Sequence, residues 1–156
     1  MARFTLPGRM EVVFMTTEPS DTAATTAAEL AAGVDLIGTS QAEELAELEG
    51  FVVNSATIAT PGYASHSVAN VSGDETYPDS RLAFYKDDTS ETIYTALAQG
   101  TTGFIAFMRD GSATGEEVEL FPVTVQSRVR RPARDQAHIF DVNFAISVPY
   151  QGVTAA

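Results

Sequence analysis

Few residues in this chain have both the type and the spacing that catalysis requires. His138 lies near Asp135 and Asp141, and an imidazole beside carboxylates could act as a general base. A single histidine at the start of a strand is far more often a surface or packing residue, so we expect no such role. The acidic pairs at 87–88 and 116–117 could bind calcium weakly, but neither lies in a twelve-residue loop with alternating oxygen ligands. Capping of a helix explains the first pair, and solvation beside a hairpin turn explains the second.

Sequence motifs of enzymes and metal sites are missing as well. The chain contains no phosphate-binding loop, no Gly-x-Ser-x-Gly elbow and no His-Glu-x-x-His pair. It has no cysteine, which excludes disulfides and thiolate ligands, and its two histidines are too few for a multi-histidine metal site. We therefore expect a protein that is not an enzyme and that binds no cofactor or resident metal.

Length and composition predict one globular domain that spans residues 1–156. A hydrophobic content of 44% supports a sizeable core. No apolar run approaches the ~18 residues that a membrane span needs, and the N-terminus lacks the apolar stretch of a signal peptide. We expect synthesis in the cytoplasm and no membrane partner.

The charge is unevenly distributed along the chain. The net charge is −12, and the segment between Met10 and Ser80 has twelve acids and no lysine or arginine. Phosphate neutralisation needs a broad basic surface, so this balance argues against a nucleic-acid-binding protein. Four of the nine basic residues form a cluster at Arg128, Arg130, Arg131 and Arg134. The cluster could pair with the acidic segment of a neighbouring copy, or it could flank a solvated turn.

Alternation with a period of two predicts a mainly β protein. Between Phe140 and Val148, alternate residues form one apolar face and one face of small polar groups. Residues 103–108 are apolar on both faces, so this strand is either central in a sheet or covered by another copy. After Pro122, the alternation of inward-pointing apolar residues shifts by one position along the chain. This shift predicts a bulge at Phe121 and Pro122. Further strands are expected at 9–16, 51–58 and 81–85.

Capping signals predict short helices. Thr26 and Glu29 have capping-box spacing and Gly33 follows, so a helix is expected at 26–32. The same spacing at Ser40 and Glu43 indicates a helix at 40–49, or an irregular exposed loop. An amphipathic helix that packs on the sheet is expected at 90–99. Residues 1–25 should form an N-terminal strand and arm, and residues 150–156 a C-terminal tail.

The segment 59–80 is unusual in length and composition. It is rich in glycine, serine, asparagine, aspartate and proline, and loops above about 12–15 residues are usually functional or disordered. It has more apolar residues than a simple linker, namely Tyr63, Val68, Val71 and Tyr77. The segment is therefore either a contact loop that becomes ordered against a partner or an exposed surface loop.

The order of these segments resembles one protein family. The series comprises Ala28-Glu-Leu-Ala-Ala-Gly-Val-Asp35, a long acidic and polar segment, Leu82-Ala-Phe-Tyr85, a capped helix ending in Leu97-Ala-Gln-Gly100, Thr102-Gly-Phe-Ile-Ala-Phe107, Val118-Glu-Leu-Phe-Pro-Val123 and a closing alternating strand. Over about residues 26–149 the chain is similar to the major tail proteins, or tail tube proteins, of long-tailed non-contractile bacteriophages, particularly phages of actinobacteria.

The resemblance implies a β-sandwich or barrel with one flanking short helix at about 90–99. It also implies that six copies join into a ring whose inner strands form one β-barrel. Such rings stack into a tail tube that carries DNA, as non-specific cargo, into the host. The implied partners are further copies, the tape measure protein, the tail terminator and the distal tail protein, and the implied location is the virion.

On this interpretation, strands at 117–130 and 136–148 belong to the inner sheet. The residues expected to face the lumen are Thr124, Gln126, Asp141, Asn143 and Ser147. The residues expected at contacts between subunits are Tyr63, Val68, Val71, Tyr77, Phe104, Phe107, Glu43, Glu44, Glu47, Arg128, Arg130, Arg131 and Arg134. The acids could line the lumen, where they would repel phosphate, or coat the outside.

Two other interpretations fit part of the same pattern. One is another virion β protein, such as a tail terminator, a neck protein or a head-decoration protein. Filament formation separates it from a tube protein, because a terminator stops at a ring. The other is a soluble β-sandwich that binds a ligand or a carbohydrate. Against it, the chain has no tryptophan and few aromatic residues on polar faces that could stack on sugars.

Overall fold

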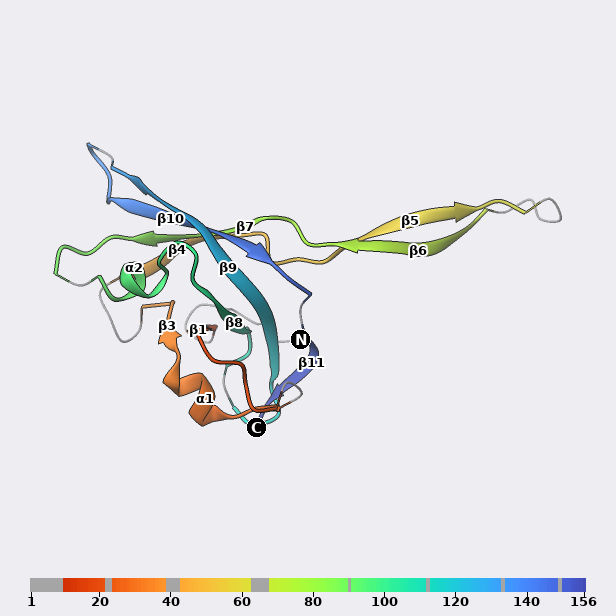
Figure 1. The fold of residues 1–156 in the computed structure, drawn as a ribbon, viewed down its shortest axis with the longest axis horizontal. Coiled ribbons are helices and arrows are strands. Elements are labelled where there is room, and N and C mark those ends of the chain that lie inside the picture. The colour runs from red at the N-terminus through yellow and green to blue at the C-terminus, as the bar shows by residue number, and fades with distance from the viewer. Residues whose placement is uncertain are drawn as a thin grey trace, which may run out of the picture.

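A computed structural model shows a mainly β protein with two short helices, in agreement with the expected fold class (Figure 1). The structure describes residues 10–21, 24–38, 43–62, 68–89, 91–111, 113–132, 134–148 and 150–156. The strands are β1 (Glu11–Met15), β2 (Ala24–Thr25), β3 (Val34–Asp35), β4 (Glu44–Glu49), β5 (Asn54–Thr60), β6 (Ala69–Thr76), β7 (Ser80–Tyr85), β8 (Thr102–Met108), β9 (Glu117–Arg131), β10 (Ile139–Ile146) and β11 (Tyr150–Ala155). The helices are α1 (Ala27–Ala32) and α2 (Thr92–Ala96).

The strands form one large sheet of nine strands and a separate sheet that contains only β5 and β6. In the large sheet, neighbours follow the antiparallel order β3-β1-β8-β9-β10-β7-β4. The long strand β9 links two parts of this sheet, because its residues up to Leu120 pair with β11 and its residues from Val123 pair with β10. We refer to β4, β7, β10 and residues 123–131 of β9 as the four-stranded section.

Two hydrophobic cores lie on opposite faces of β8. Ile105 and Phe107 belong to the larger core, whereas Ala106 and Met108 belong to the smaller one. Successive side chains of a strand point to opposite faces, so β8 is buried on both sides. The apolar sequence at 103–108 is thus explained by a central position between β1 and β9, and it needs no second copy to cover it.

The two helices cover different cores. Leu30 of α1 packs in the smaller core, whereas Ile93 of α2 and the C-cap residue Leu97 pack in the larger one. The helix expected at 90–99 is present but shorter. Its N-cap residue Glu91 makes no side-chain capping hydrogen bond.

The helix expected at 26–32 is confirmed with its capping box. The backbone N–H of Glu29 donates to Oγ1 of Thr26 at 3.2 Å, and the backbone N–H of Thr26 donates to Oε2 of Glu29 at 2.9 Å. Hydrogen bonds from the backbone of Ser20 and then of Thr26 lower the pKa of Glu29 to about 2. Stability from this carboxylate is present above its ordinary pKa of 4.5 and is lost as the pH falls toward 2.

The helix expected at 40–49 is wrong, because residues 44–49 form the strand β4. β4 pairs with β7 and places Leu45 opposite Phe84, where Leu45 packs against the larger core. Backbone pairing with β7 and this packing outweigh a local capping signal, since helix propensity is a weak prior. Glu43 does not start a helix here. Its carboxylate instead reaches the beginning of α2.

The phase change around Pro122 does not come from the expected bulge. β8 and β9 pair without a shift through this region, with Phe104 opposite Pro122. The phase changes because buried side chains before Phe121 pack in the smaller core, whereas those from Phe121 onward pack in the larger core on the other face. The register of β9 shifts farther along, against β10, between Asn143 and Phe144.

Part of the segment expected as a loop at 59–80 forms strands, because β5 extends from Asn54 to Thr60 and β6 spans Ala69–Thr76. β5 and β6 pair antiparallel and project away from the rest of the molecule (Figure 1). We refer to these two strands as the arm. Polar and small residues suit exposed strands as well as turns, so composition alone did not separate the two.

The two ends of the described chain lie in the large sheet. The expected N-terminal strand at 9–16 is β1 (Glu11–Met15). The C-terminal tail expected at 150–156 is wrong, because β11 pairs with β9 and, in parallel, with β2. The backbone N–H of Gly115 donates to the carbonyl of Ala155 at 2.8 Å, which ties β11 to the turn between β8 and β9.

Candidate assembly surfaces

One face of the four-stranded section carries the charged and small polar side chains, together with the exposed Val129 and Tyr85, and the other packs on the larger core. We refer to the first as the polar face. Thr124, Asp141 and Asn143 lie on the polar face, because the residues next to them in sequence point into the core. Gln126 lies at the register shift of β9, and Ser147 follows the end of β10, where both are exposed. The structure therefore brings three of the five residues expected in the lumen onto one face.

Asp141 on this face anchors a network of ion pairs and is only 8% exposed. Its Oδ1 lies 3.0 Å from Nη1 of Arg81, and its Oδ2 lies 2.6 Å from Nε of Arg131. Nη2 of Arg81 also lies 3.0 Å from a carboxylate oxygen of Glu47 and 3.0 Å from one of Glu49. The hydrogen bond with Glu49, followed by those with the other carboxylates, raises the pKa of Arg81 above its ordinary value. The network joins all four strands of the section.

Arg81 is a functional candidate that sequence reasoning missed. The signal was present, because Arg81 is the first basic residue after a segment of twelve acids. It lies at the start of a strand that the sequence does predict. Only the pairing of β7 with both β4 and β10 shows that its neighbours are carboxylates.

The arginine cluster divides between the two faces of the section. On the side of α2, the guanidinium groups of Arg128 and Arg130 lie 4.1 Å and 4.5 Å from the ring centroid of Tyr94. Arg128 also donates to the backbone carbonyl of Tyr94, and Nη2 of Arg130 lies 3.7 Å from Oε1 of Glu91. On the polar face, Arg131 pairs with Asp141. These three arginines thus have partners within one chain and are not simply solvated.

Arg134 differs from the rest of the cluster. It lies in the connection between β9 and β10 and is exposed. The sequence suggested pairing of the cluster with Glu43, Glu44 and Glu47 of a neighbouring copy. Within this chain, Arg131 already lies 3.7 Å from Glu47. The carboxylate of Glu47 thus contacts both Arg81 and Arg131 of the same chain.

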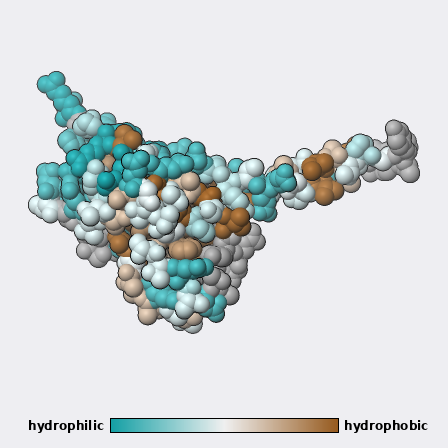
Figure 2. Space-filling view, in the orientation of Figure 1, coloured by the Kyte–Doolittle hydropathy of each residue, from teal (hydrophilic) through white to brown (hydrophobic). Residues whose placement is uncertain are grey.

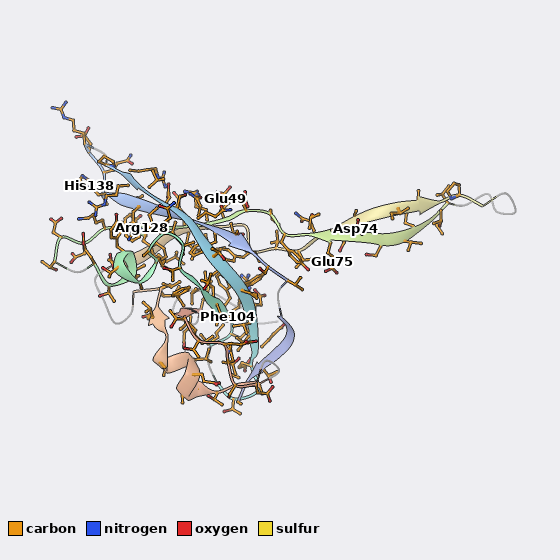
Figure 3. The ribbon with its side chains drawn as sticks, viewed as in Figure 1. Glu49, Asp74, Glu75, Phe104, Arg128 and His138 are labelled. Atoms are coloured by element: carbon orange, nitrogen blue, oxygen red, sulfur yellow. The ribbon has the colours of Figure 1, made fainter. Side chains whose placement is uncertain are left out.

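Two residues expected at subunit contacts lie inside the chain. Phe107 in the larger core and Glu43 at the start of β4 are both 0% exposed. Their side chains cannot reach a neighbouring copy, which corrects the expectation. Phe104 is partly buried against the smaller core (Figure 3). Glu44 is exposed on β4.

Glu43 caps α2 from a distant position in the sequence. Its Oε2 accepts a hydrogen bond from the backbone N–H of Ile93 at 2.6 Å. Its buried Oε1 has no hydrogen-bond partner among the described residues. Burial raises the pKa of Glu43 above its ordinary value, and the negative charges of Glu91 and Asp87 act in the same direction. The carboxylate therefore fixes α2 to β4 while carrying an unfavourable buried charge.

We expect Glu43→Gln to remove a pH-dependent contribution to stability. A carboxyl group with a raised folded pKa stabilises the fold fully below its unfolded pKa, and this contribution is lost as the pH rises through the folded pKa. The glutamine keeps an oxygen acceptor for the N–H of Ile93 but cannot ionise. The free energy of unfolding of the parent, relative to the variant, should therefore fall as the pH rises from about 4.5.

Urea unfolding across a pH series measures this difference. Glu44→Gln, at the exposed neighbouring position, is the matched control for replacing a carboxylate by an amide at the start of β4. Glu43→Ala should cost about 1–3 kcal/mol, because it leaves the N–H of Ile93 buried without an acceptor. A difference between the parent and Glu43→Gln that does not change with pH would contradict the role assigned to the buried charge.

The four-stranded section has two open edges in the part of the chain that the structure describes. On one side, β4 pairs in the sheet only with β7, and at its outer edge the backbone N–H of Leu45 donates to the carbonyl of Ile37 at 3.5 Å. On the other side, β8 pairs with β9 as far as Thr124, and Val125 makes the last backbone hydrogen bonds there. From Ser127 to Arg131, β9 pairs only with β10. Such edges present unpaired N–H and C=O groups that can accept a strand from another chain.

The arm carries exposed apolar residues. Val68 and Val71 are 57% and 53% exposed, as their expected contact role requires, whereas Tyr77 is partly buried. Tyr63 lies outside the described residues. Sequence reasoning missed Ile58, which lies opposite Val71 and is 55% exposed. The sequence feature that could have indicated Ile58 is a branched apolar residue at the end of the strand expected at 51–58.

The described residues contain no group of three or more side chains that could hold a metal ion. His138 is exposed at the start of β10, where its backbone carbonyl accepts a hydrogen bond from the N–H of Lys86 at 2.8 Å (Figure 3). Among the helices that the structure describes, none has the length and apolar character needed to cross a membrane.

Comparisons with known proteins find a family and a similar fold. A family model described as phage tail tube protein matches residues 1–156. A solved chain from the six-fold symmetrised cryo-EM structure of the anti-feeding prophage baseplate superposes with a TM-score of 0.56, covering 96% of this chain and 95% of that chain. The two sequences are 8% identical, so this match shows the fold alone. No curated protein matches the chain.

Proposed function

The chain belongs to the phage tail tube protein family and forms the tail tube of a virion, and we propose that it does so as six-membered rings stacked into a tube that conducts DNA. The family is a structural one, and the chain is not an enzyme. The observation that carries the proposal is the four-stranded section, with two open edges and one polar face. The resemblance of the sequence to tail proteins of actinobacteriophages supports a long, non-contractile tail.

Ring closure would use the two open edges. The free edge of β4 pairs with residues 127–131 of β9 in the neighbouring copy, so each subunit extends the sheet of the next. A contact between different surfaces of identical subunits closes into a ring when the rotation per copy divides a full turn. The six-fold symmetry of the structurally similar baseplate supports six copies.

The polar face of the section would line the lumen. Thr124, Gln126, Asn143 and Ser147 would meet water and DNA, with Asp141 held beneath Arg81 and Arg131. The opposite face is filled by the larger core and α2. A net charge of −12 repels phosphate, so DNA would pass as non-specific cargo without binding tightly.

The remaining surfaces would contact other copies and the other tail proteins. We assign the arm and the exposed residues Glu44 and Arg134 to contacts between copies, together with Phe104. The tape measure protein inside the tube and the terminator and distal tail proteins at its ends follow from the sequence resemblance. The whole chain acts as one tail-tube domain in this arrangement.

Light scattering after size-exclusion chromatography, combined with negative-stain microscopy, tests the proposal over a range of protein concentrations. Rings that lengthen into tubes as the concentration rises are the expected result. Single rings that never stack would instead indicate a tail terminator. A strict monomer at high concentration that also fails to join phage tails would contradict the proposal.

Cysteine labelling tests the assignment of the lumen. Cysteines at Asn143 and Ser147 should react with a bulky thiol reagent in monomers and be shielded in tubes, because the reagent cannot enter the lumen freely. Ala31→Cys is the control, since Ala31 is exposed on α1, which covers the other core. Equal labelling of Asn143→Cys in tubes and monomers would place the polar face outside.

A further inference from the structure

One short helix contacts both edges of the four-stranded section. β4 forms one open edge, and residues 127–131 of β9 form the other. The helix α2 packs on the core face of the section, where the ring of Tyr94 contacts that of Phe140 on β10 with the centroids 5.3 Å apart (Figure 1). A helix of five residues has too few backbone hydrogen bonds to be stable by itself. The order of α2 therefore depends on its contacts with the rest of the fold.

The first of these contacts holds α2 to the β4 edge. Glu43 directly precedes β4 and is 0% exposed. Its Oε2 accepts a hydrogen bond from the backbone N–H of Ile93 at 2.6 Å, and Ile93 is itself buried in the larger core. The position of this turn of α2 thus fixes the chain where it enters β4.

The second contact holds α2 to the β9 edge. Arg128 and Arg130 lie opposite Val142 and Phe140, so their side chains leave β9 on the core face. Both guanidinium groups lie within 5 Å of the ring centroid of Tyr94, at 4.1 Å and 4.5 Å, and Arg128 also donates to the carbonyl of Tyr94. Cations over an aromatic ring attract its electrons. Figure 2 shows mostly hydrophilic residues over this end of the molecule, so charged contacts contribute strongly to the hold on α2 here.

We propose that α2 couples the two open edges, so that a change of order at one edge reaches the other. The two contacts meet at neighbouring residues, because Glu43 binds Ile93 and the arginines bind Tyr94. A single helical turn moves as a unit. Loss of either contact therefore weakens the position on which the other contact depends.

The coupling has a consequence for assembly that rests on the proposed ring closure. A strand from a neighbouring copy would order the edge on which it pairs, and α2 would transmit part of that order to the opposite edge of the same copy. Coupling between two sites is reciprocal, so the effect is the same whichever edge is occupied first. Each added copy thus favours addition of the next, and closed rings form in preference to short open chains.

Hydrogen exchange of the full chain tests the coupling, at a concentration where light scattering shows single copies. Tyr94→Leu removes the ring under Arg128 and Arg130 but leaves Glu43 and Ile93 in place. Exchange should quicken by about threefold or more, relative to β8, in residues 127–131 and also in β4. Tyr94→Phe keeps the ring and should exchange like the parent at both edges.

A second substitution tests the opposite direction. Glu43→Ala removes the acceptor for Ile93 and should quicken exchange at residues 127–131 of β9, although it changes no residue that contacts the arginines. Glu43→Gln keeps an oxygen acceptor and should stay near the parent. Leu30→Ala is the control for a general loss of stability, because Leu30 packs in the smaller core. It should not quicken either edge relative to β8.

The outcomes separate this inference from the proposed function. If Tyr94→Leu affects only β9 and Glu43→Ala affects only β4, the edges are independent and the coupling is overturned, while the ring proposal stands. An equal rise in β8 would attribute the effect to lost stability and overturn it as well. Coupled exchange in a chain that forms no rings would support the coupling and contradict the proposed function.

Discussion

Replacing Phe51 with alanine is expected to lower the free energy of unfolding by about 3–5 kcal/mol. That is a large part of the ~5–15 kcal/mol that stabilises a small domain. Phe51 is 2% exposed, and its ring centroid lies 4.9 Å from that of Phe107, 5.6 Å from Phe121 and 6.0 Å from Phe144. Truncation removes these edge and tilted contacts and leaves a cavity at the centre of the larger core.

The position of Phe51 makes the arm depend on the same contacts. Gly50 and Phe51 both have positive φ, at 86° and 57°, as the chain leaves β4 for the arm. The backbone N–H of Phe51 donates to Oγ of Ser80 at 2.8 Å, which joins the outgoing segment to the start of β7. Phe51→Ala should therefore loosen the root of the arm and impair ring stacking in addition to lowering stability.

Urea unfolding measures the first effect, and the concentration needed for tube formation measures the second. Val53→Ala is the matched control, because Val53 lies two residues later and is 38% exposed. That change should stay within about 0.5 kcal/mol of the parent. A loss below about 1 kcal/mol for Phe51→Ala would show that Phe51 does not hold the core together.

Arg81→Met should also have a large effect, lowering the free energy of unfolding by about 2 kcal/mol. The methionine keeps much of the apolar stem but removes the cation between Glu47, Glu49 and Asp141. Three carboxylates would then face one another, with Arg131 as the remaining cation in the network. The side chain of Arg81 is 27% exposed, so water offsets part of the loss and the cost stays below that of a fully buried pair.

The strand β4 should detach first in this variant, because Arg81 is its main charged link to the sheet. Hydrogen exchange should quicken in β4 before it does in β8, and the effect should grow at low salt. Arg109→Met is the control, since Arg109 forms one ion pair among the described residues, with Glu119 at 3.0 Å, and is more exposed. It should cost about 0–1 kcal/mol. Equal losses for the two variants would mean that the network contributes no more than one surface pair.

The elements that could be predicted from the sequence are those specified by neighbouring residues. The capping box of Thr26 and Glu29 acts within one helical turn, so the helix at 26–32 is found where it was expected. The alternation from Phe140 to Val148 and the doubly apolar segment at 103–108 reflect the faces of single strands. These patterns also carry the family resemblance, because they recur in a fixed order along the chain.

The segments that were predicted wrongly depend on distant partners. Residues 44–49 carry a local helix signal, yet pairing with β7 makes them a strand, and the carboxylate of Glu43 caps a helix fifty residues away. Residues 59–80 have loop composition, yet much of this segment pairs with the strand before it. The bulge at Pro122 was inferred from one face of β9, whereas two separate cores bury its two faces.

By itself, the sequence predicted a mainly β, strongly acidic protein without catalytic motifs. The order of its segments resembles that of a tail tube family. Periodicity and composition suffice for the β content, the acidity and the lack of catalytic motifs, because these are sums over short segments, whereas the family was indicated by a resemblance. Only the tertiary structure decided that Asp141 is covered by Arg81 and Arg131, that Phe107 is buried, and that the arm projects away from the rest of the molecule. Those properties depend on which strands become neighbours. Strand pairing brings together residues that lie far apart in the sequence, so no pattern of neighbouring residues predicts it.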